Sequence, residues 1–247
     1  MKPTTLLLLA TTVLLCTACP SKTKTPAVAQ KKDSAVVNGF YIDSSELNGD
    51  PYKNFSSSAD TAAVQSLLDS IQPLLNGPFK EWASTFRNFQ LSDFRFANRR
   101  PFDSVETISR KDLDSMLQLY QPFLHYSADK TKAIDLYSAS LYLEKRGNKY
   151  YATGDVDQTG YFLDINAMQQ QAIFHYGPSA AGELAAWQQP ARFVVGGIFV
   201  TDDGNRTPIL LIGNTDKKEI YYFENNNTNC RQVKDYTAPA LRKVIFE

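Results

Sequence analysis

Short apolar runs alternate with turn residues throughout the C-terminal half of the chain. Each run is rich in Tyr, Phe, Ile, Leu or Val, and Gly, Asn and Asp residues separate one run from the next. Runs of this length and composition are typical of β-strands. We therefore predict an antiparallel sheet within residues 131–247. The expected strands span residues 134–143, 149–153, 161–165, 172–176, 192–200, 209–212 and 219–224.

The order of these elements repeats after Trp187. Residues 161–166 can be laid on residues 209–214, and residues 172–174 on residues 220–222. Such a match indicates two copies of one antiparallel unit. The order and spacing of the strands in the second copy resemble a single blade of a β-propeller. A closed propeller needs about four blades or more, so the resemblance implies two blade-like units and excludes a complete propeller in one chain.

Before the sheet, apolar residues recur at helical intervals of three and four positions. Amphipathic helices need an apolar surface to cover. We therefore predict an α+β fold, in which amphipathic helices of residues 36–130 pack on the antiparallel sheet. The expected helices run from Asp60 to Asn76, from Phe79 to Phe89 with an aromatic face, and from a capping Ser109 to Pro122.

The first residues have the pattern of a signal peptide. A basic start at Met1-Lys2 precedes an apolar run from Leu6 to Leu15, which is too short to span a bilayer. The junction Cys16-Thr17-Ala18-Cys19 resembles a bacterial lipobox. That resemblance implies cleavage after residue 18 and a lipid on the sulfur of Cys19, which would anchor the protein to a lipid bilayer. The alternative is ordinary secretion with a free Cys19.

Residues 19–35 consist mainly of Lys, Thr, Ser, Pro and Ala, so they are expected to form a disordered tether. The mature chain is similar to uncharacterised anchored lipoproteins of the Bacteroidota, a resemblance that implies no activity. Lipoproteins exported to the cell surface in some Gram-negative phyla carry an acidic run after the anchor. The run here is basic, so we expect a periplasm-facing position in the cell envelope.

Charge and cysteine content exclude some classes of function. The 26 basic residues balance the 26 acidic ones, so no basic excess favours nucleic acid as a partner. Of the three cysteines, only Cys230 lies in the expected folded part, which rules out a disulfide within that part. Cys230 is either a buried small hydrophobe or an exposed thiol.

Of all segments in the sequence, the loop Gly154–Gly160 has the residue pattern that most suggests a functional site. Asp155, Asp157 and Thr159 place oxygen atoms at alternate positions, as in the calcium hairpin of certain propeller repeats, which this loop resembles. Position nine of that pattern is Leu163, which supplies no ligand. The alternative is a plain turn in which the Asp side chains accept hydrogen bonds from nearby backbone N–H groups.

Other chemistry has weaker support in the sequence. Gly177-Pro178-Ser179 precedes a helix-compatible stretch from Gly182 to Trp187, but both histidines come before Ser179, whereas hydrolases with that motif place the histidine after the serine. No phosphate loop, zinc motif or dinucleotide motif is present. Four arginines, Arg87 near the end of the expected second helix and Arg95, Arg99 and Arg100 after it, suggest either a basic groove or scattered salt bridges.

Two classes of function are left. The first is a non-catalytic module that binds or scaffolds an envelope protein or glycan, and the second is a periplasmic hydrolase that uses loop carboxylates. An exposed aromatic patch would favour the first. A pocket that gathers carboxylates with raised pKa values would favour the second. The absence of recognisable catalytic spacing favours binding, with no cofactor other than the calcium candidate.

Overall fold

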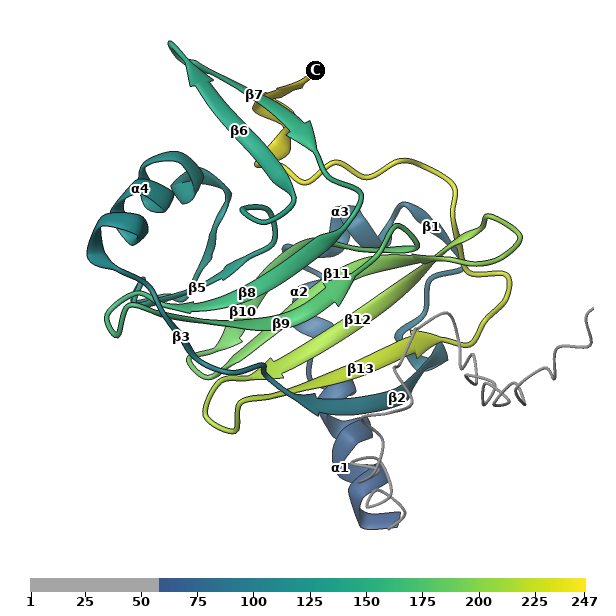
Figure 1. The fold of residues 1–247 in the computed structure, drawn as a ribbon. Coiled ribbons are helices and arrows are strands. Elements are labelled where there is room, and N and C mark those ends of the chain that lie inside the picture. The colour runs from purple at the N-terminus through teal and green to yellow at the C-terminus, as the bar shows by residue number, and fades with distance from the viewer. Residues whose placement is uncertain (1–57) are drawn as a thin grey trace, which may run out of the picture. The chain divides into compact units, whose positions relative to one another are not determined.

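Antiparallel strands make up most of the regular structure in residues 58–247, the part of the chain that this computed structural model describes (Figure 1). The expected signal peptide (1–18), Cys19 and the expected tether (19–35) lie outside this part. The described residues belong to one compact unit. None of the helices found among them is long and apolar enough to cross a membrane.

Two five-stranded sheets form the body of the described part. The central sheet has the strand order β10 (Ala180–Gln189), β11 (Arg192–Val200), β12 (Arg206–Asn214), β13 (Glu219–Asn225) and β2 (Phe94–Pro101). The second sheet has the order β3 (Glu106–Thr107), β9 (Gln169–Tyr176), β8 (Gln158–Asp164), β5 (Lys132–Asp135) and β4 (His125–Tyr126).

Two smaller sheets complete the β structure of residues 58–247. In one, β7 (Lys149–Gly154) pairs antiparallel with β6 (Leu141–Arg146) and parallel with β15 (Val244–Phe246). In the other, β1 (Phe86–Arg87) pairs with β14 (Arg231–Gln232). The helical elements are α1 (Ser58–Asp69), α2 (Gln72–Leu75), α3 (Lys80–Ala83), α4 (Arg110–Tyr120) and the short 3₁₀ helices η1 (Leu91–Asp93), η2 (Gln121–Phe123) and η3 (Leu241–Lys243).

The central sheet is buried on both faces. Helices α1, α2 and α3 pack on one face, and each fully buried large side chain there contributes about 2 kcal/mol. On the opposite face Phe102 contacts both Phe193 of the central sheet and Phe162 of the second sheet. Burial on both faces explains why β11 and β12 have nearly continuous apolar runs. The helix-facing core contains Leu68, Ile71, Phe79, Trp82, Val194, Leu210, Ile212 and Phe223.

Two of the three expected helices are confirmed. The first is present as α1 and α2, and the third is α4, whose first turn is capped by a 3.1 Å hydrogen bond from the Asp112 N–H to Ser109 Oγ. Residues of α4 pack on the second sheet, through a cluster centred on Leu124, Ala133 and Leu163. Helix packing on the sheets therefore follows the prediction, but on two different sheets.

The prediction of a second helix from Phe79 to Phe89 is wrong. Helix α3 covers only Lys80–Ala83, and Asn88 adopts a left-handed φ of 55°, which no helix can continue. Phe86 lies in β1 instead, yet its ring still contacts Trp82 at 5.0 Å. The turn places these aromatic side chains in contact, as a helix would. Their spacing in the sequence is therefore compatible with either a helix or a turn.

Strands also occur where helices were expected. In residues 36–130, β2 joins the central sheet by pairing with β13, and β3 and β4 lie at the two edges of the second sheet. The stretch from Gly182 to Trp187, expected to be compatible with a helix, belongs to strand β10. The expected strand 134–143 is two strands, because Asp135 Oδ1 accepts hydrogen bonds from the N–H groups of Tyr137 and Ser138 (2.9 and 3.0 Å) and turns the chain. The other expected strands coincide with β7, β8, β9, β11, β12 and β13.

The two turns that join β8 to β9 and β12 to β13 are alike. Asp164 Oδ1 accepts a hydrogen bond from the Ala167 N–H (2.9 Å), and Asn214 Oδ1 accepts one from the Lys217 N–H (3.0 Å). Each turn then has one non-glycine residue at positive φ, Met168 at 53° and Lys218 at 54°. These turns equate residue 164 with residue 214, which is two positions away from the match made on sequence. A shift of two keeps every side chain on the same face.

Candidate functional site

A cavity of about 350 Å³ opens where strand β10 begins. The turn after β5 contributes Tyr137, the loop before β8 contributes Asp155, and β10 contributes Glu183. The C-terminal segment covers the cavity with side chains that include Tyr236 and Phe246. Pockets of this size that combine apolar walls with a few polar groups are typical of sites for small ligands.

Glu183, one of the lining residues, lies in a β-bulge. Gly182 pairs with Gly197 and Leu184 pairs with Gly196, so Glu183 has no partner on strand β11. An extra residue of this kind changes the direction in which a side chain points, and such bulges are frequent beside functional sites. Gly197 on the opposite strand allows this close pairing because it has no side chain. A Cβ atom at this position would lie 2.2 Å from the carbonyl oxygen of Ala181. The Gly-Gly pair is therefore a structural requirement for the placement of Glu183.

The Glu183 carboxyl is held in a partly buried position. Its Oε2 accepts a 2.7 Å hydrogen bond from Nε1 of Trp82, and the indole itself is fully buried against Phe79 and Phe86. The hydroxyl of Tyr137 donates to the Glu183 backbone oxygen at 2.9 Å. Burial raises the pKa of Glu183 from its ordinary 4.5 to about 7, although the Trp82 hydrogen bond opposes the rise. Near neutral pH the carboxyl is therefore divided between its acid and its anion.

Gln158 joins the two sheets beside the cavity. Its Nε2 donates to the carbonyl oxygens of Leu136 (2.8 Å) and Gly182 (3.0 Å), and its Oε1 accepts from the Gly182 N–H at 2.7 Å. The side-chain amide thus pairs with the edge of β10 as a neighbouring strand would. This contact fixes the start of β10, and hence Glu183, against the second sheet.

The ionisable groups that line the cavity are all acidic. They are the carboxyls of Asp155 and Glu183 and the phenols of Tyr137 and Tyr236. Burial raises the pKa of Tyr236 to about 12 and that of Tyr137 above its usual range, so both phenols stay neutral. No Lys, Arg or His side chain belongs to the lining. The cavity is consequently neutral or negative at every pH at which the protein is folded.

Of the three residues expected to bind calcium, only Asp155 lines the cavity. Its Oδ1 accepts a 2.6 Å hydrogen bond from the Val156 N–H, the arrangement of a plain turn. Thr159 lies on strand β8, and its Oγ1 is 3.0 Å from Nδ1 of His175. Within residues 58–247 no group of three or more His, Cys, Asp or Glu side chains is placed to hold a metal ion. Calcium at Asp155, Asp157 and Thr159 stays a hypothesis, and a thermal melt with millimolar calcium and with chelator tests it.

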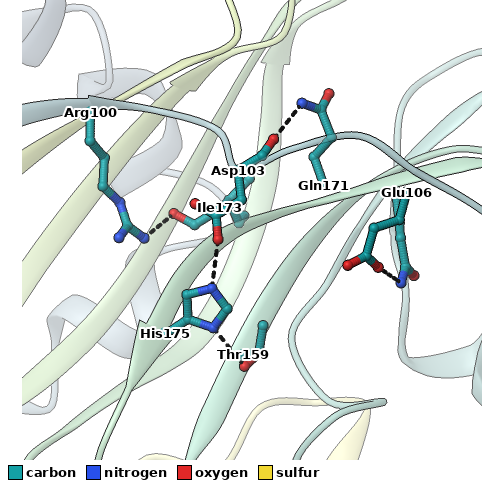
Figure 2. Close-up of polar contacts among 8 residues, drawn as sticks. Arg100, Asp103, Glu106, Thr159, Gln171, Ile173 and His175 are labelled. Atoms are coloured by element: carbon teal, nitrogen blue, oxygen red, sulfur yellow. Dashed lines mark hydrogen bonds and ion pairs between the residues drawn. The ribbon is translucent and has the colours of Figure 1, made fainter. Parts of the chain in front are cut away.

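Figure 2 shows that the Thr159–His175 contact continues to Asp103, whose Oδ2 is 2.7 Å from Nε2 of His175. The His175 and Asp103 side chains are 55% and 46% exposed, so water screens this pair and its contribution is small. Arg100 donates to the Ile173 oxygen (2.6 Å), and Gln171 donates to the Asp103 oxygen (2.9 Å). These contacts tie the chain between β2 and β3 to β9, which is a structural role.

Other sequence-based alternatives are decided by the structure. Cys230 is fully buried, and burial raises its pKa to about 11, so it is the inert small hydrophobe and not an exposed thiol. The arginines between the expected helices are not assembled into a basic groove, since Arg99 pairs with Glu219 at 3.1 Å and Arg100 lies over the ring of Tyr222. Ser179 is followed by a strand, not by the helix that a nucleophile motif requires.

Sequence reasoning missed Glu183, Tyr137 and Tyr236. One signal was present: a Gly-Gly pair inside a strand of large apolar residues indicates a bulge or a close backbone approach. That signal identifies the strand, but the pairing partner that carries the bulge follows only from the sheet. Comparisons of this chain with protein-family models, with curated proteins and with solved structures found no match.

Proposed function

We propose that this protein is a lipid-anchored protein of the bacterial cell envelope that binds a small ligand in the cavity at Glu183 without transforming it. The supporting observation is that Glu183, a bulge residue with a partly buried carboxyl, lines a cavity of about 350 Å³. Bulges, perturbed carboxyls and small apolar cavities each occur elsewhere for structural reasons. Their coincidence at one residue supports a binding site.

The two tryptophans of the chain offer a direct test of binding. The indole N–H of Trp82 donates to Glu183, whereas that of Trp187 donates to the His125 oxygen at 2.8 Å, outside the cavity lining. Full-length protein labelled with ¹⁵N-tryptophan should therefore give two indole signals, of which only that of Trp82 moves when small amines, amino sugars and neutral sugars are added. If no compound in this set moves the Trp82 signal at millimolar concentration, binding in the cavity is refuted.

A hydrolase is the second candidate, and one observation favours it. A carboxyl with a pKa of about 7 suits a general acid or base, and Asp155 lines the same cavity. Binding is preferred because a hydrolytic pair needs a second carboxyl in a matched position, and Asp155 is engaged with its own turn. Turnover of an ester or glycoside by the full chain, abolished in Glu183→Gln, would replace the binding function with a hydrolytic one.

The proposed location in the envelope depends on Cys19. The lipobox-like junction, the basic start and the polar residues 19–35 support a lipid anchor and a flexible tether, with an envelope protein or glycan as the expected neighbour. Metabolic labelling with palmitate should mark the natural protein and not Cys19→Ala. Protease added to intact cells should leave the protein intact if it faces the periplasm, and should cleave it if it lies on the cell surface.

We also propose that β8–β9 and β12–β13 belong to two copies of one blade-like unit. Their matching turns support this relation, with the β6–β7 hairpin as an insertion in the first copy. If the turns are equivalent, replacing residues 165–168 by the sequence of residues 215–218 should leave the melting temperature nearly unchanged. A loss of folding in that variant would contradict the repeat.

A further inference from the structure

We propose that the cavity at Glu183 selects a small organic cation, a protonated amine or a quaternary ammonium group. This inference rests on the proposed binding function and adds the chemical class of the ligand. It follows from three properties of the same cavity: the sign of its charges, the side chains of its walls and its size.

The charges around Glu183 favour a cation. Among the lining residues, the two that carry a formal charge are the acids Asp155 and Glu183. Arg206 is a basic group that acts on the Glu183 carboxyl, and it is paired with Asp235 at 3.3 Å. On the helix side, Arg242 is paired with Glu81. An anion entering the cavity would meet acidic side chains and no basic one among the lining residues, whereas a cation would meet its counter-ion.

The walls supply the second requirement of an ammonium site. Three aromatic residues, Tyr137, Tyr236 and Phe246, line the cavity together with Glu183. Aromatic rings attract ammonium groups through their quadrupole, and sites of this composition are used to bind quaternary ammonium ligands. Phe246 is 54% exposed, which places one of the aromatic rings at the solvent-facing side of the cavity.

Volume limits the ligand to a small molecule. At about 350 Å³ the cavity lies near the lower end of the size range of ligand pockets. It suits a compound such as choline or an amino sugar, and it excludes a folded chain or a polymer segment. An amine attached to an envelope glycan could enter by its terminal residue only.

Ionisation of Glu183 predicts how the affinity for a cation should depend on pH. A cation binds the ionised carboxyl, and the fraction of Glu183 that is ionised rises as the pH passes through about 7. Between pH 6 and pH 8 this fraction increases roughly tenfold, so the apparent affinity for a permanently charged ligand should rise by about the same factor. The groups around Glu183 are Trp82, Gln232, Tyr137, Tyr236, Arg206 and Asp235. Burial raises the pKa of both tyrosines, so neither phenol ionises near neutral pH.

Choline and its neutral isostere 3,3-dimethylbutan-1-ol provide a matched pair for the test. In the full-length protein, choline should move the Trp82 indole signal and bind at least tenfold more tightly than the isostere, with the pH dependence given above. Glu183→Gln should lose this preference, whereas the control Glu106→Gln, which removes an equal charge from the exposed strand β3, should keep it. Glucosamine and glucose should repeat the contrast with a primary amine.

The outcomes separate this inference from the proposed function. If the isostere or glucose binds as tightly as its charged counterpart, the cation preference is wrong while ligand binding in the cavity stands. An affinity for choline that Glu183→Gln leaves unchanged also refutes the preference. If neither charged nor neutral compounds move the Trp82 signal, both the inference and the binding function fail.

Discussion

Replacing Glu183 by Gln should change how the stability of the folded protein depends on pH. The variant keeps the shape of the side chain and an acceptor for the Trp82 N–H, but it cannot ionise. In the natural protein the pKa of Glu183 is 4.5 when unfolded and about 7 when folded. The unfolded chain therefore loses this proton first as the pH rises, and folding becomes less favourable between these two values.

The magnitude follows from the size of the shift. A pKa difference of about 2.5 corresponds to roughly 3 kcal/mol between the two protonation states. The stabilising contribution of the neutral carboxyl is fully present below pH 4.5 and is lost as the pH rises through about 7. Relative to the natural protein, Glu183→Gln should thus gain about 3 kcal/mol on going from pH 4.5 to pH 8. In melting temperature this gain amounts to roughly 6–12 °C for a domain of this size.

The natural protein alone would not reveal this effect, because His125 acts in the opposite direction. Burial lowers the pKa of His125 from 6.5 to about 4, so its imidazole is neutral in the folded state and the unfolded state takes up the proton first. That residue makes folding more favourable as the pH rises between these values. The two trends overlap and partly cancel, which is why the comparison must be made between the variant and the natural protein.

Urea unfolding at intervals from pH 4.5 to pH 8.5 measures the required difference in free energy of unfolding. Glu106→Gln is the control, because it makes the same change of Glu to Gln at a side chain that is exposed on strand β3. A difference between Glu183→Gln and the natural protein that stays constant across this range would refute the placement of Glu183 in a partly buried cavity.

Three further substitutions test the fold around the site by thermal or urea unfolding. Gly197→Ala should destabilise the protein by more than about 2 kcal/mol, because the new Cβ would lie 2.2 Å from a carbonyl oxygen across the bulge; a smaller loss would mean that the bulge can relax. Gln158→Leu should cost about 2–4 kcal/mol, since it removes three hydrogen bonds, two of them to Gly182 of the other sheet, and leaves the edge of β10 unpaired; a neutral effect would contradict its bridging role. Ser109→Ala should cost about 1 kcal/mol through loss of the cap of α4, whereas Ser109→Asp should restore it.

Local sequence patterns were sufficient to predict those elements whose tertiary contacts favour the same secondary structure as their own residues do. The runs around Phe193 and Leu210 are rich in large apolar residues and form β11 and β12 as predicted. Ser109 was identified as a cap because the chemistry of a helix N-terminus involves only neighbouring residues. The antiparallel sheet could be anticipated in this way, whereas the choice between a buried and an exposed Cys230 could not.

Local patterns failed where a partner distant in sequence decided the outcome. The stretch Ala180–Ala186 contains Ala, Glu and Leu, which favour helices, yet it is an edge strand because β11 supplies its hydrogen bonds. The apolar run 134–143 was taken for one strand, because the turn at Asp135 depends on a buried carboxylate that pattern alone does not reveal.

The sequence by itself determined that the chain folds mainly as antiparallel sheet, that Ser109 caps helix α4, and which pattern the first nineteen residues carry. Only the tertiary structure decided that Glu183 is the residue without a partner. A bulge is a property of two paired strands, and its position depends on where Gly196 and Gly197 meet β10. The pKa of a carboxyl likewise depends on the water that its neighbours exclude, so the candidate site could not be located before the sheets were assembled.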